Sequence, residues 1–173
     1  LYDNALLARV YLEAGQVVPD SDYSAVATEV LDYILREMQG PEGGYYSATD
    51  ADSEGVEGKF FVFEPADILS MVENEKDARC FCAYYDITDA GNWEGTSIAH
   101  TPVARKEVAQ RLDMTGADLS SPLDRARAQV YEARARRVPP LLDDKILVAW
   151  NGLMIGAMAE GARVLDRPDY LQS

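Results

Sequence analysis

The chain has 173 residues, of which 47% are hydrophobic and 27% charged, which suffices for an ordinary globular core and excludes a disordered segment. Its formal net charge of −14 argues against nucleic acid as a partner, because phosphate contacts need a basic surface, and equally against an anionic membrane surface. A neutral ligand, a cationic ligand or a metal ion remains compatible with this charge, and solubility alone would also explain it.

Residues 1–15 are apolar nearly all the way round a helix, and Gly15 is expected to end that helix. A helix of this kind must be surrounded by other elements. Asp20–Asp22 then offer capping side chains to an amphipathic helix over residues 23–38. The pattern predicts a first helical hairpin over residues 1–38.

Residues 39–121 follow a different pattern, which predicts a β/helical insertion. A glycine-rich loop at residues 40–44 precedes short strands on both sides of an acidic stretch at residues 50–58. The elements expected here are strands at residues 45–47, 59–63 and 97–100, and helices at residues 65–72, 77–85 and 107–112.

Residues 122–173 return to helical periodicity. Ser121 and Pro122 are expected to begin an amphipathic helix that runs to residue 137, and Asp144 is expected to cap an apolar helix over residues 145–165. Gly152 and Gly156 would let a neighbour approach that helix closely. Residues 168–170 resemble residues 19–23 and would open another outer helix, so the sequence indicates a weak repeat of helical hairpins and a mainly α fold.

Loop lengths predict where a site would lie. The connections after the apolar helices, at residues 16–21 and 166–168, are short, whereas those after the amphipathic helices are long. In a stack of antiparallel helices, the long loops therefore share one rim with the starts of the apolar helices. Binding and catalytic residues often lie on long loops that a rigid scaffold positions, so any site is expected at this rim.

Cys80 and Cys82 are separated by one residue, so on a helix they would point about 200° apart, which suits neither a disulfide nor a shared metal. Two buried thiols indicate a reducing compartment, and no signal peptide is visible. The longest apolar stretch, residues 146–159, is interrupted by Asn151 and is too short to cross a bilayer. These features predict a cytoplasmic protein.

Four segments carry a resemblance to a known family: LYDNALLA at 1–8, PEGGYYSATDADSEGVEGKFFVF at 41–63, GNWEG followed by SIAH at 91–100, and DDKILVAWNGLMI at 143–155. In order and spacing they resemble the spermatogenesis-associated protein 20 family. The resemblance implies part of an (α/α) six-hairpin, glycosidase-like toroid with a small antiparallel β excursion, similar to N-acylglucosamine 2-epimerases. It also implies an N-terminal thioredoxin-like domain and later toroid hairpins as missing partners from the same chain, which agrees with the absence of a starting Met.

The acidic stretch begins like a calcium loop, with Asp50, Asp52 and Glu54 alternating before Gly55. The twelfth position is Phe61, where a bidentate glutamate is required, so no metal site is predicted. The carboxylates would instead cap turns or hold substrate hydroxyls at the rim.

Candidate catalytic groups are carboxylates, because pairs of them perform general acid–base work in glycoside hydrolysis. The candidates are Asp3, Asp50, Asp52 and Asp144, with Asp143 also eligible; Asp144 has the competing role of helix cap. The single histidine, His100, lies away from the apolar helices and is expected to be structural. No cofactor is predicted.

Candidate substrate-binding residues share a place at the expected rim and pair aromatic rings with amides and charges. They are Tyr2, Asp3, Asn4, Tyr45, Asp144, Lys145, Trp150 and Asn151. The alternative is that these polar groups bond to loop backbone.

The leading hypothesis is a fragment of a carbohydrate-active domain, epimerase/isomerase-like or glycosidase-like, with a small carbohydrate ligand and no activity as a fragment alone. The alternatives are a non-catalytic scaffold coupled to the thioredoxin-like module and a helical repeat that binds peptide.

Overall fold

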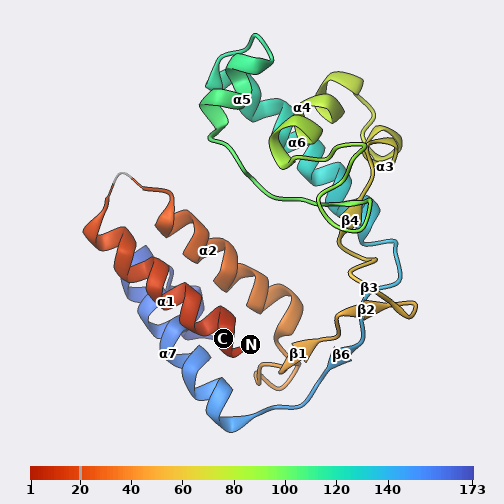
Figure 1. Ribbon diagram of the computed structural model, residues 1–173. Helices are drawn as coiled ribbons and strands as arrows, with labels where there is room; N and C mark the ends of the chain where they lie inside the picture. Colours follow the sequence, from red (N-terminus) through yellow and green to blue (C-terminus); the bar gives the residue numbers. More distant parts are fainter. Residues whose placement is uncertain (20) are drawn as a thin grey trace. The chain divides into compact units, whose positions relative to one another are not determined.

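The computed structural model describes residues 1–19 and 21–173. These residues form two compact units: unit 1 comprises residues 1–50 and 142–173, and unit 2 comprises residues 51–141. Most of the chain is helical, and the named strands are two-residue segments in antiparallel pairs, as the predicted mainly α fold requires (Figure 1). Within the described ranges, none of the helices is both long enough and apolar enough to cross a membrane.

Unit 1 is a group of three long helices with a short strand pair at one end. Its elements are α1 (Tyr2–Val17), α2 (Tyr23–Tyr33), the π-helical turn η1 (Ile34–Met38), β1 (Ala48–Thr49), β6 (Leu142–Asp143), α7 (Val148–Leu165) and the 3₁₀ turn η2 (Pro168–Leu171). The α2 helix returns along α1, and α7 lies on another side of α1 (Figure 1).

The helices α1 and α7 run parallel. Tyr2 lies against Trp150 near the start of each helix, with ring centroids 4.9 Å apart, and further along the Arg9 Nε atom lies 3.3 Å from an oxygen of Glu160. The two apolar helices therefore begin at the same end of unit 1, which is the geometry that the loop lengths predicted.

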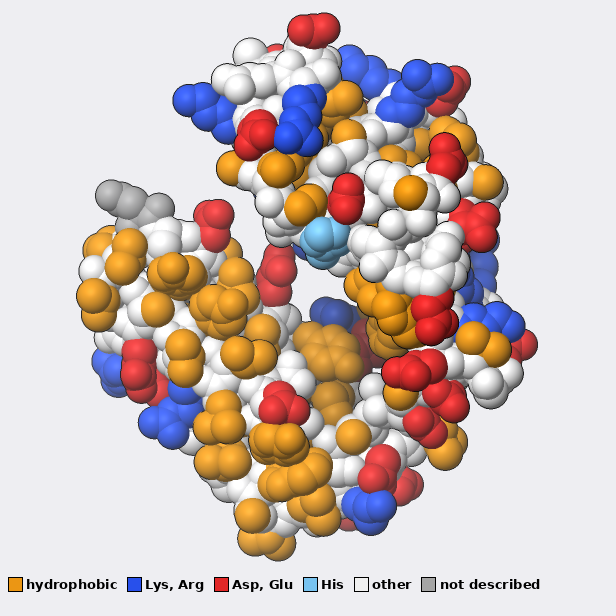
Figure 2. Space-filling view, in the orientation of Figure 1, with side chains coloured by type: hydrophobic (Ala, Val, Ile, Leu, Met, Phe, Trp, Pro, Cys, Tyr) orange, Lys and Arg blue, Asp and Glu red, His pale blue; other side chains and the backbone are white. Residues whose placement is uncertain are grey.

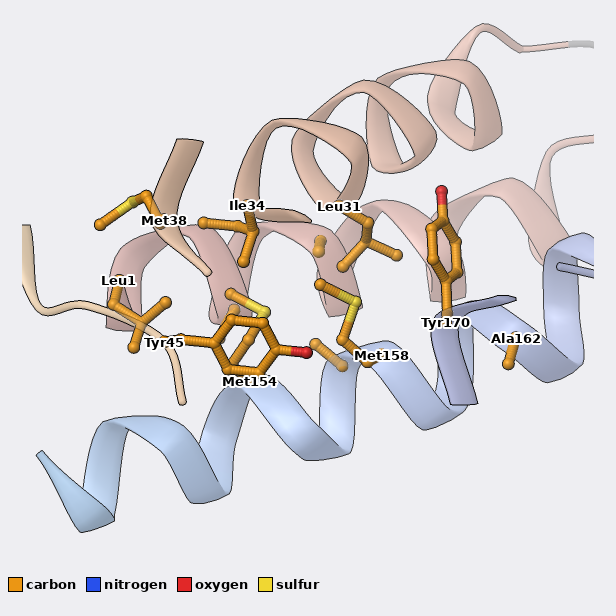
Figure 3. Packing of buried hydrophobic residues seen from close by; sticks show 12 residues of the cluster. Leu1, Leu31, Ile34, Met38, Tyr45, Met154, Met158, Ala162 and Tyr170 are labelled. Atoms are coloured by element: carbon orange, nitrogen blue, oxygen red, sulfur yellow. The ribbon is translucent and has the colours of Figure 1, made fainter. Parts of the chain in front are cut away.

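The core of unit 1 lies between these three helices (Figure 3). Leu31 and Ile34 point from α2 and η1 toward Met154 and Met158 of α7, and all four side chains are buried. Small residues complete the contact: a methyl group added at Gly161 would collide with Leu31 and meet the Tyr170 ring at 3.3 Å. Close approach of α7 to α2 thus depends on Gly161.

The outer flank of α1 is not covered as the sequence pattern required. Leu6 and Val10 are 47% and 60% exposed, and on α7 Ile155 is 61% exposed. Nothing lies within 4 Å of a methyl group built on Gly152 or Gly156, so the neighbour expected there is absent from the described part of the chain. Two flanking helices can bury only two sides of a helix that is apolar all round.

Unit 2 contains four helices and two short strand pairs. Its elements are β2 (Asp52–Ser53), β3 (Val56–Glu57), β4 (Val62–Phe63), α3 (Pro65–Met71), α4 (Glu75–Tyr85), β5 (Ser97–Ile98), α5 (Arg105–Arg111) and α6 (Gly116–Arg134). β2 pairs with β3, and β4 pairs with β5. The α6 helix packs against α3, α4 and α5 and closes two apolar clusters, one around Phe81 and one around Leu119.

Helix α6 differs from its prediction in where it starts. It begins at Gly116 rather than at Ser121–Pro122, because Thr115 and Asp118 form a reciprocal capping box, and Pro122 lies inside the helix. The buried stripe of α6 is covered by α4 and α5, and residues 122–137 lie in unit 2.

Two other predicted helix ends were wrong, and a third, at the start of α2, lies where predicted but lacks the expected capping bond. Gly15 does not end α1, which continues to Val17; Gly15 instead provides space beside Ser24, whose hydroxyl would lie 2.6 Å from an added methyl group. The predicted cap at Asp22 makes no side-chain cap bond, and Asp20 lies outside the described residues. Asp144 does not cap α7, which begins at Val148, because Leu142 and Asp143 are held in extended pairing with β1.

The predicted strand at residues 45–47 is also displaced. Tyr45 forms only a single bridge with Gln39, and the strand proper is Ala48–Thr49. In the second predicted strand, residues 59–63, extended pairing is confined to Val62–Phe63.

Candidate functional site

The starts of α1 and α7 meet at a common rim. The backbone nitrogen of Leu1 donates to the Ser47 carbonyl at 2.8 Å, and both the backbone nitrogen and the hydroxyl of Ser47 donate to the Asp143 carbonyl at 3.1 Å. The pairing of Ala48 with Asp143 extends this connection into β1 and β6. The residues before α1, the segment after η1 and the segment before α7 are therefore held together by backbone bonds.

An aromatic pair lies at this rim. The rings of Tyr2 and Trp150 are tilted by 57° at a centroid distance of 4.9 Å. Tyr2 is 40% exposed and Trp150 is half-buried, with its inner edge against the core of unit 1. The pair therefore presents part of a rigid aromatic surface to solvent.

Charged side chains lie near the aromatic pair in sequence, on α1 and in the segment that precedes α7. Asp3, Asp144 and Lys145 are exposed and Asn4 is half-buried. The Lys145 ammonium lies 2.9 Å from Asp143, and its hydrogen bond lowers the pKa of the Asp143 carboxyl. Lys145 is thus engaged by Asp143, whereas Asp3 and Asp144 present their carboxylates to solvent.

Two of the expected ligand residues, Tyr45 and Asn151, have structural roles. The Asn151 side chain is buried and forms a two-sided clamp: its Oδ1 accepts from the Tyr45 backbone nitrogen at 2.8 Å, and its Nδ2 donates to the Tyr45 carbonyl at 2.9 Å. Its Nδ2 also donates to the Leu147 carbonyl at 3.1 Å. Tyr45 is only 2% exposed, so neither residue offers a surface to a ligand.

The reason for the clamp is the geometry of the loop after η1. The backbone bonds from Gly40 to Gly44 and from Tyr46 to Met38 flank the Gln39–Tyr45 bridge, so Tyr45 occupies a non-hydrogen-bonded position of the pair. Its own N–H and C=O groups point away from Gln39 and need other partners in the core. The Asn151 amide provides one acceptor and one donor in the required spacing.

A second polar network, which the sequence reasoning missed, fastens the end of the chain to α2. The Tyr170 hydroxyl donates to Asp32 at 2.8 Å, and the Arg167 guanidinium bonds both Asp32 and Asp169 while it lies 4.4 Å from the Tyr170 ring. The Tyr45 hydroxyl reaches the same segment through Ser173 at 2.6 Å. Burial, and then the hydrogen bond to the Asp32 carboxylate, raise the pKa of Tyr170. The sequence could not predict this network, because Arg167 joins aspartates of two elements that are far apart in the chain and leave no periodic pattern.

The remaining catalytic candidates, Asp50 and Asp52, lie at the acidic stretch. Asp50 is the exposed residue at the end of the first segment of unit 1, and Asp52 belongs to β2 of unit 2, opposite Glu57. The turn of this hairpin, Glu54–Gly55, has positive φ at both residues, which suits a tight two-residue connection. Among residues 1–19 and 21–173, no three His, Cys, Asp or Glu side chains form a group that could hold a metal ion.

Several arginines of α6 and of the segment after it make structural contacts within unit 2. Arg125 makes a bidentate contact with the buried Asp77, at 2.7 and 2.9 Å, and Arg137 donates to the Val62 carbonyl at 2.8 Å. Arg134 lies over the rings of Phe60, Phe61 and Tyr131 at 5.3 to 5.5 Å. The His100 side chain contacts the Asp86 carboxylate at 3.0 Å within unit 2.

These features define a mainly α protein whose helical unit 1 has an aromatic and acidic rim at the common start of two parallel helices. No protein-family model matches the chain. The chain is similar to the spermatogenesis-associated protein 20 of Homo sapiens and of Rattus norvegicus, each 31% identical over 95% of this chain. An uncharacterized protein of Caenorhabditis elegans is 26% identical over 99% of the chain.

The chain belongs to the spermatogenesis-associated protein 20-like family. It spans about a quarter of the length of these relatives, 24% of the human and rat proteins and 27% of the worm protein.

Proposed function

We propose that unit 1 contributes a carbohydrate-binding rim to a carbohydrate-active domain of the longer protein. The observation that supports it is the Tyr2–Trp150 pair at the common start of α1 and α7, in which Tyr2 is exposed and is followed directly in sequence by Asp3 and Asn4. Aromatic faces pack against the C–H surface of a pyranose, and carboxylates and amides bind its hydroxyls.

The ligand we propose is a small neutral saccharide. The net charge of −14 and the exposed Asp3 and Asp144 disfavour an anionic sugar, because like charges would repel it. Asp3 and Asp144 would accept hydrogen bonds from sugar hydroxyls, with Tyr2 and Trp150 beneath the ring. The catalytic step, epimerase/isomerase-like or glycosidase-like, would require further residues of the longer chain. The two free thiols, Cys80 and Cys82, suit a cytoplasmic location.

The test is a titration of the full-length protein with a panel of neutral mono- and disaccharides, read by tryptophan fluorescence and thermal stability. The chain has two tryptophans, so Trp93→Phe leaves Trp150 as its reporter within these 173 residues. A ligand that binds only the folded state raises the apparent stability by mass action, about 2.7 kcal/mol at a hundred times its Kd.

Matched tyrosine variants identify the site. Tyr2→Ala should weaken sugar binding about tenfold or more, which corresponds to the loss of one stacking contact. Tyr23→Ala is the control, because Tyr23 has the same exposure, 39% against 40%, and also contacts one ring, Tyr11, but lies at the start of α2. Equal effects of the two substitutions, or no response to any sugar, would refute the proposal.

A second candidate function is a non-catalytic scaffold attached to a thioredoxin-like module. The observation in its favour is the exposed apolar flank of unit 1, formed by Leu6 and Val10 of α1 with Ile155 of α7; Figure 2 shows hydrophobic side chains gathered over these helices. Absence of any sugar response, with unchanged activity of the full-length protein after Asp3→Ala and Asn4→Ala, would favour the scaffold.

A further inference from the structure

Unit 2 contains an open pocket of about 450 Å³ that is remote in sequence from the rim of unit 1. Its walls come from the β2–β3 hairpin, the turn before β4, the first turn of α3 and the segment that follows α6. The lining residues are Ser53, Glu54, Lys59, Phe60, Val62, Asp67, Arg136, Arg137 and Val138. The walls therefore combine an apolar part with a set of charged groups.

The charges of this pocket are unusual for so acidic a chain. Three cationic side chains, Lys59, Arg136 and Arg137, face two carboxylates, Glu54 and Asp67, which leaves one positive charge in excess. Over the whole chain, acidic residues outnumber basic ones by 30 to 16. A local excess of positive charge in a concave site attracts anions even where the whole molecule repels them.

The cationic side chains of the pocket differ in how strongly they are bound to other groups of the protein. Arg137 is held in place by the Val62 carbonyl at 2.8 Å through its Nη1 atom, while its Nη2 atom lies 3.7 Å from Asp67, which is too long for a hydrogen bond. Lys59 contacts Glu54 at 2.7 Å in a pair that is half exposed on both sides, and such pairs contribute little and exchange readily.

Among the described residues, the Arg136 guanidinium is the cationic group of the pocket that has no ion-pair partner. Its side chain is exposed at the pocket. Beside it, Phe60, Val62 and Val138 give the pocket an apolar wall, and Phe60 is kept in place by Arg134 at 5.3 Å. Positioned guanidinium groups bind planar carboxylates and phosphates through paired N–H bonds.

We propose that this pocket binds a small organic anion, a carboxylate or a phosphate ester, whose charged group contacts Arg136 and the Nη2 atom of Arg137 and whose apolar part contacts Phe60. Lys59 would leave Glu54 to join the oxyanion. This site is separate from the sugar-binding rim, and either one can be present without the other.

The experiment is an NMR titration of the backbone amides with three probes at equal ionic strength: benzoate, phenyl phosphate and chloride. The expected result is saturable shifts at residues 53–62 and 136–138 with one or both organic anions and none with chloride. Benzoate and phenyl phosphate distinguish a carboxylate ligand from a phosphate ester.

Charge-matched variants complete the test. Arg136→Gln should weaken binding about tenfold, whereas Arg163→Gln, which removes an exposed arginine from α7 of unit 1, should leave it unchanged. Lys59→Gln gives a second, smaller loss and avoids the structural role of Arg137. Shifts that chloride reproduces, or an equal loss in Arg136→Gln and Arg163→Gln, would overturn the proposal.

Discussion

Removal of the Asn151 side chain should destabilise unit 1 strongly, because it removes the hydrogen-bond partners of the Tyr45 backbone N–H and C=O groups. Asn151→Ala leaves a buried N–H, bonded at 2.8 Å, and a buried C=O, bonded at 2.9 Å, without a protein partner. Each unsatisfied buried group costs about 1 to 3 kcal/mol, and partial relaxation of the loop would lower the sum to about 2 to 4 kcal/mol.

Urea unfolding followed by Trp150 fluorescence in the Trp93→Phe background would measure this loss, and hydrogen exchange of the Tyr45 amide would locate it. Asn151→Asp keeps the acceptor but places a second oxygen against the Tyr45 carbonyl, so its deficit should shrink as the carboxyl becomes protonated. Gln16→Ala is the control, since that exposed amide bonds to the Leu12 carbonyl of its own helix. A loss below about 0.5 kcal/mol for Asn151→Ala, with unchanged protection of Tyr45, would refute the reasoning.

Three further predictions concern packing, charge and pH. Gly161→Ala should cost about 1 to 3 kcal/mol in unfolding free energy by collision with the core, whereas Gly152→Ala, in open space on the same helix, should stabilise by up to about 1 kcal/mol; equal effects in urea unfolding would contradict the packing account. Arg125→Gln should lower the thermal stability of unit 2 because it leaves the buried Asp77 carboxylate without its cation, and an unchanged melting temperature would count against that pairing. Burial raises the pKa of the Cys80 thiol above its ordinary value of 9.0, so the folded state holds the proton more tightly and stability should fall as pH rises through about 9; Cys80→Ala should flatten this part of the stability–pH curve, and identical slopes would disprove the contribution.

The sequence by itself determined the types of element and the end of unit 1 at which polar groups collect. Apolar residues repeat with helical spacing along α1 and α7, and this local signal is independent of the rest of the fold. The short connection after α1 and the long one after η1 then predicted that α1 and α7 start at the same end, which the Tyr2–Trp150 contact confirms. Four sequence blocks with the right order also sufficed for the family.

Only the tertiary structure decided what the individual polar residues do. Asn151 is indistinguishable in sequence from a ligand-binding amide, because its role depends on a loop 106 positions away whose strand pairing leaves two backbone groups unsatisfied. Asp144 does not act as the predicted helix cap, because the pairing of β6 with β1 keeps the chain extended and α7 starts later. The α6 helix packs against α3, α4 and α5, a choice of partners that an amphipathic pattern alone does not specify. Periodicity is a property of neighbouring residues, whereas hydrogen-bond demand and packing are properties of the assembled core.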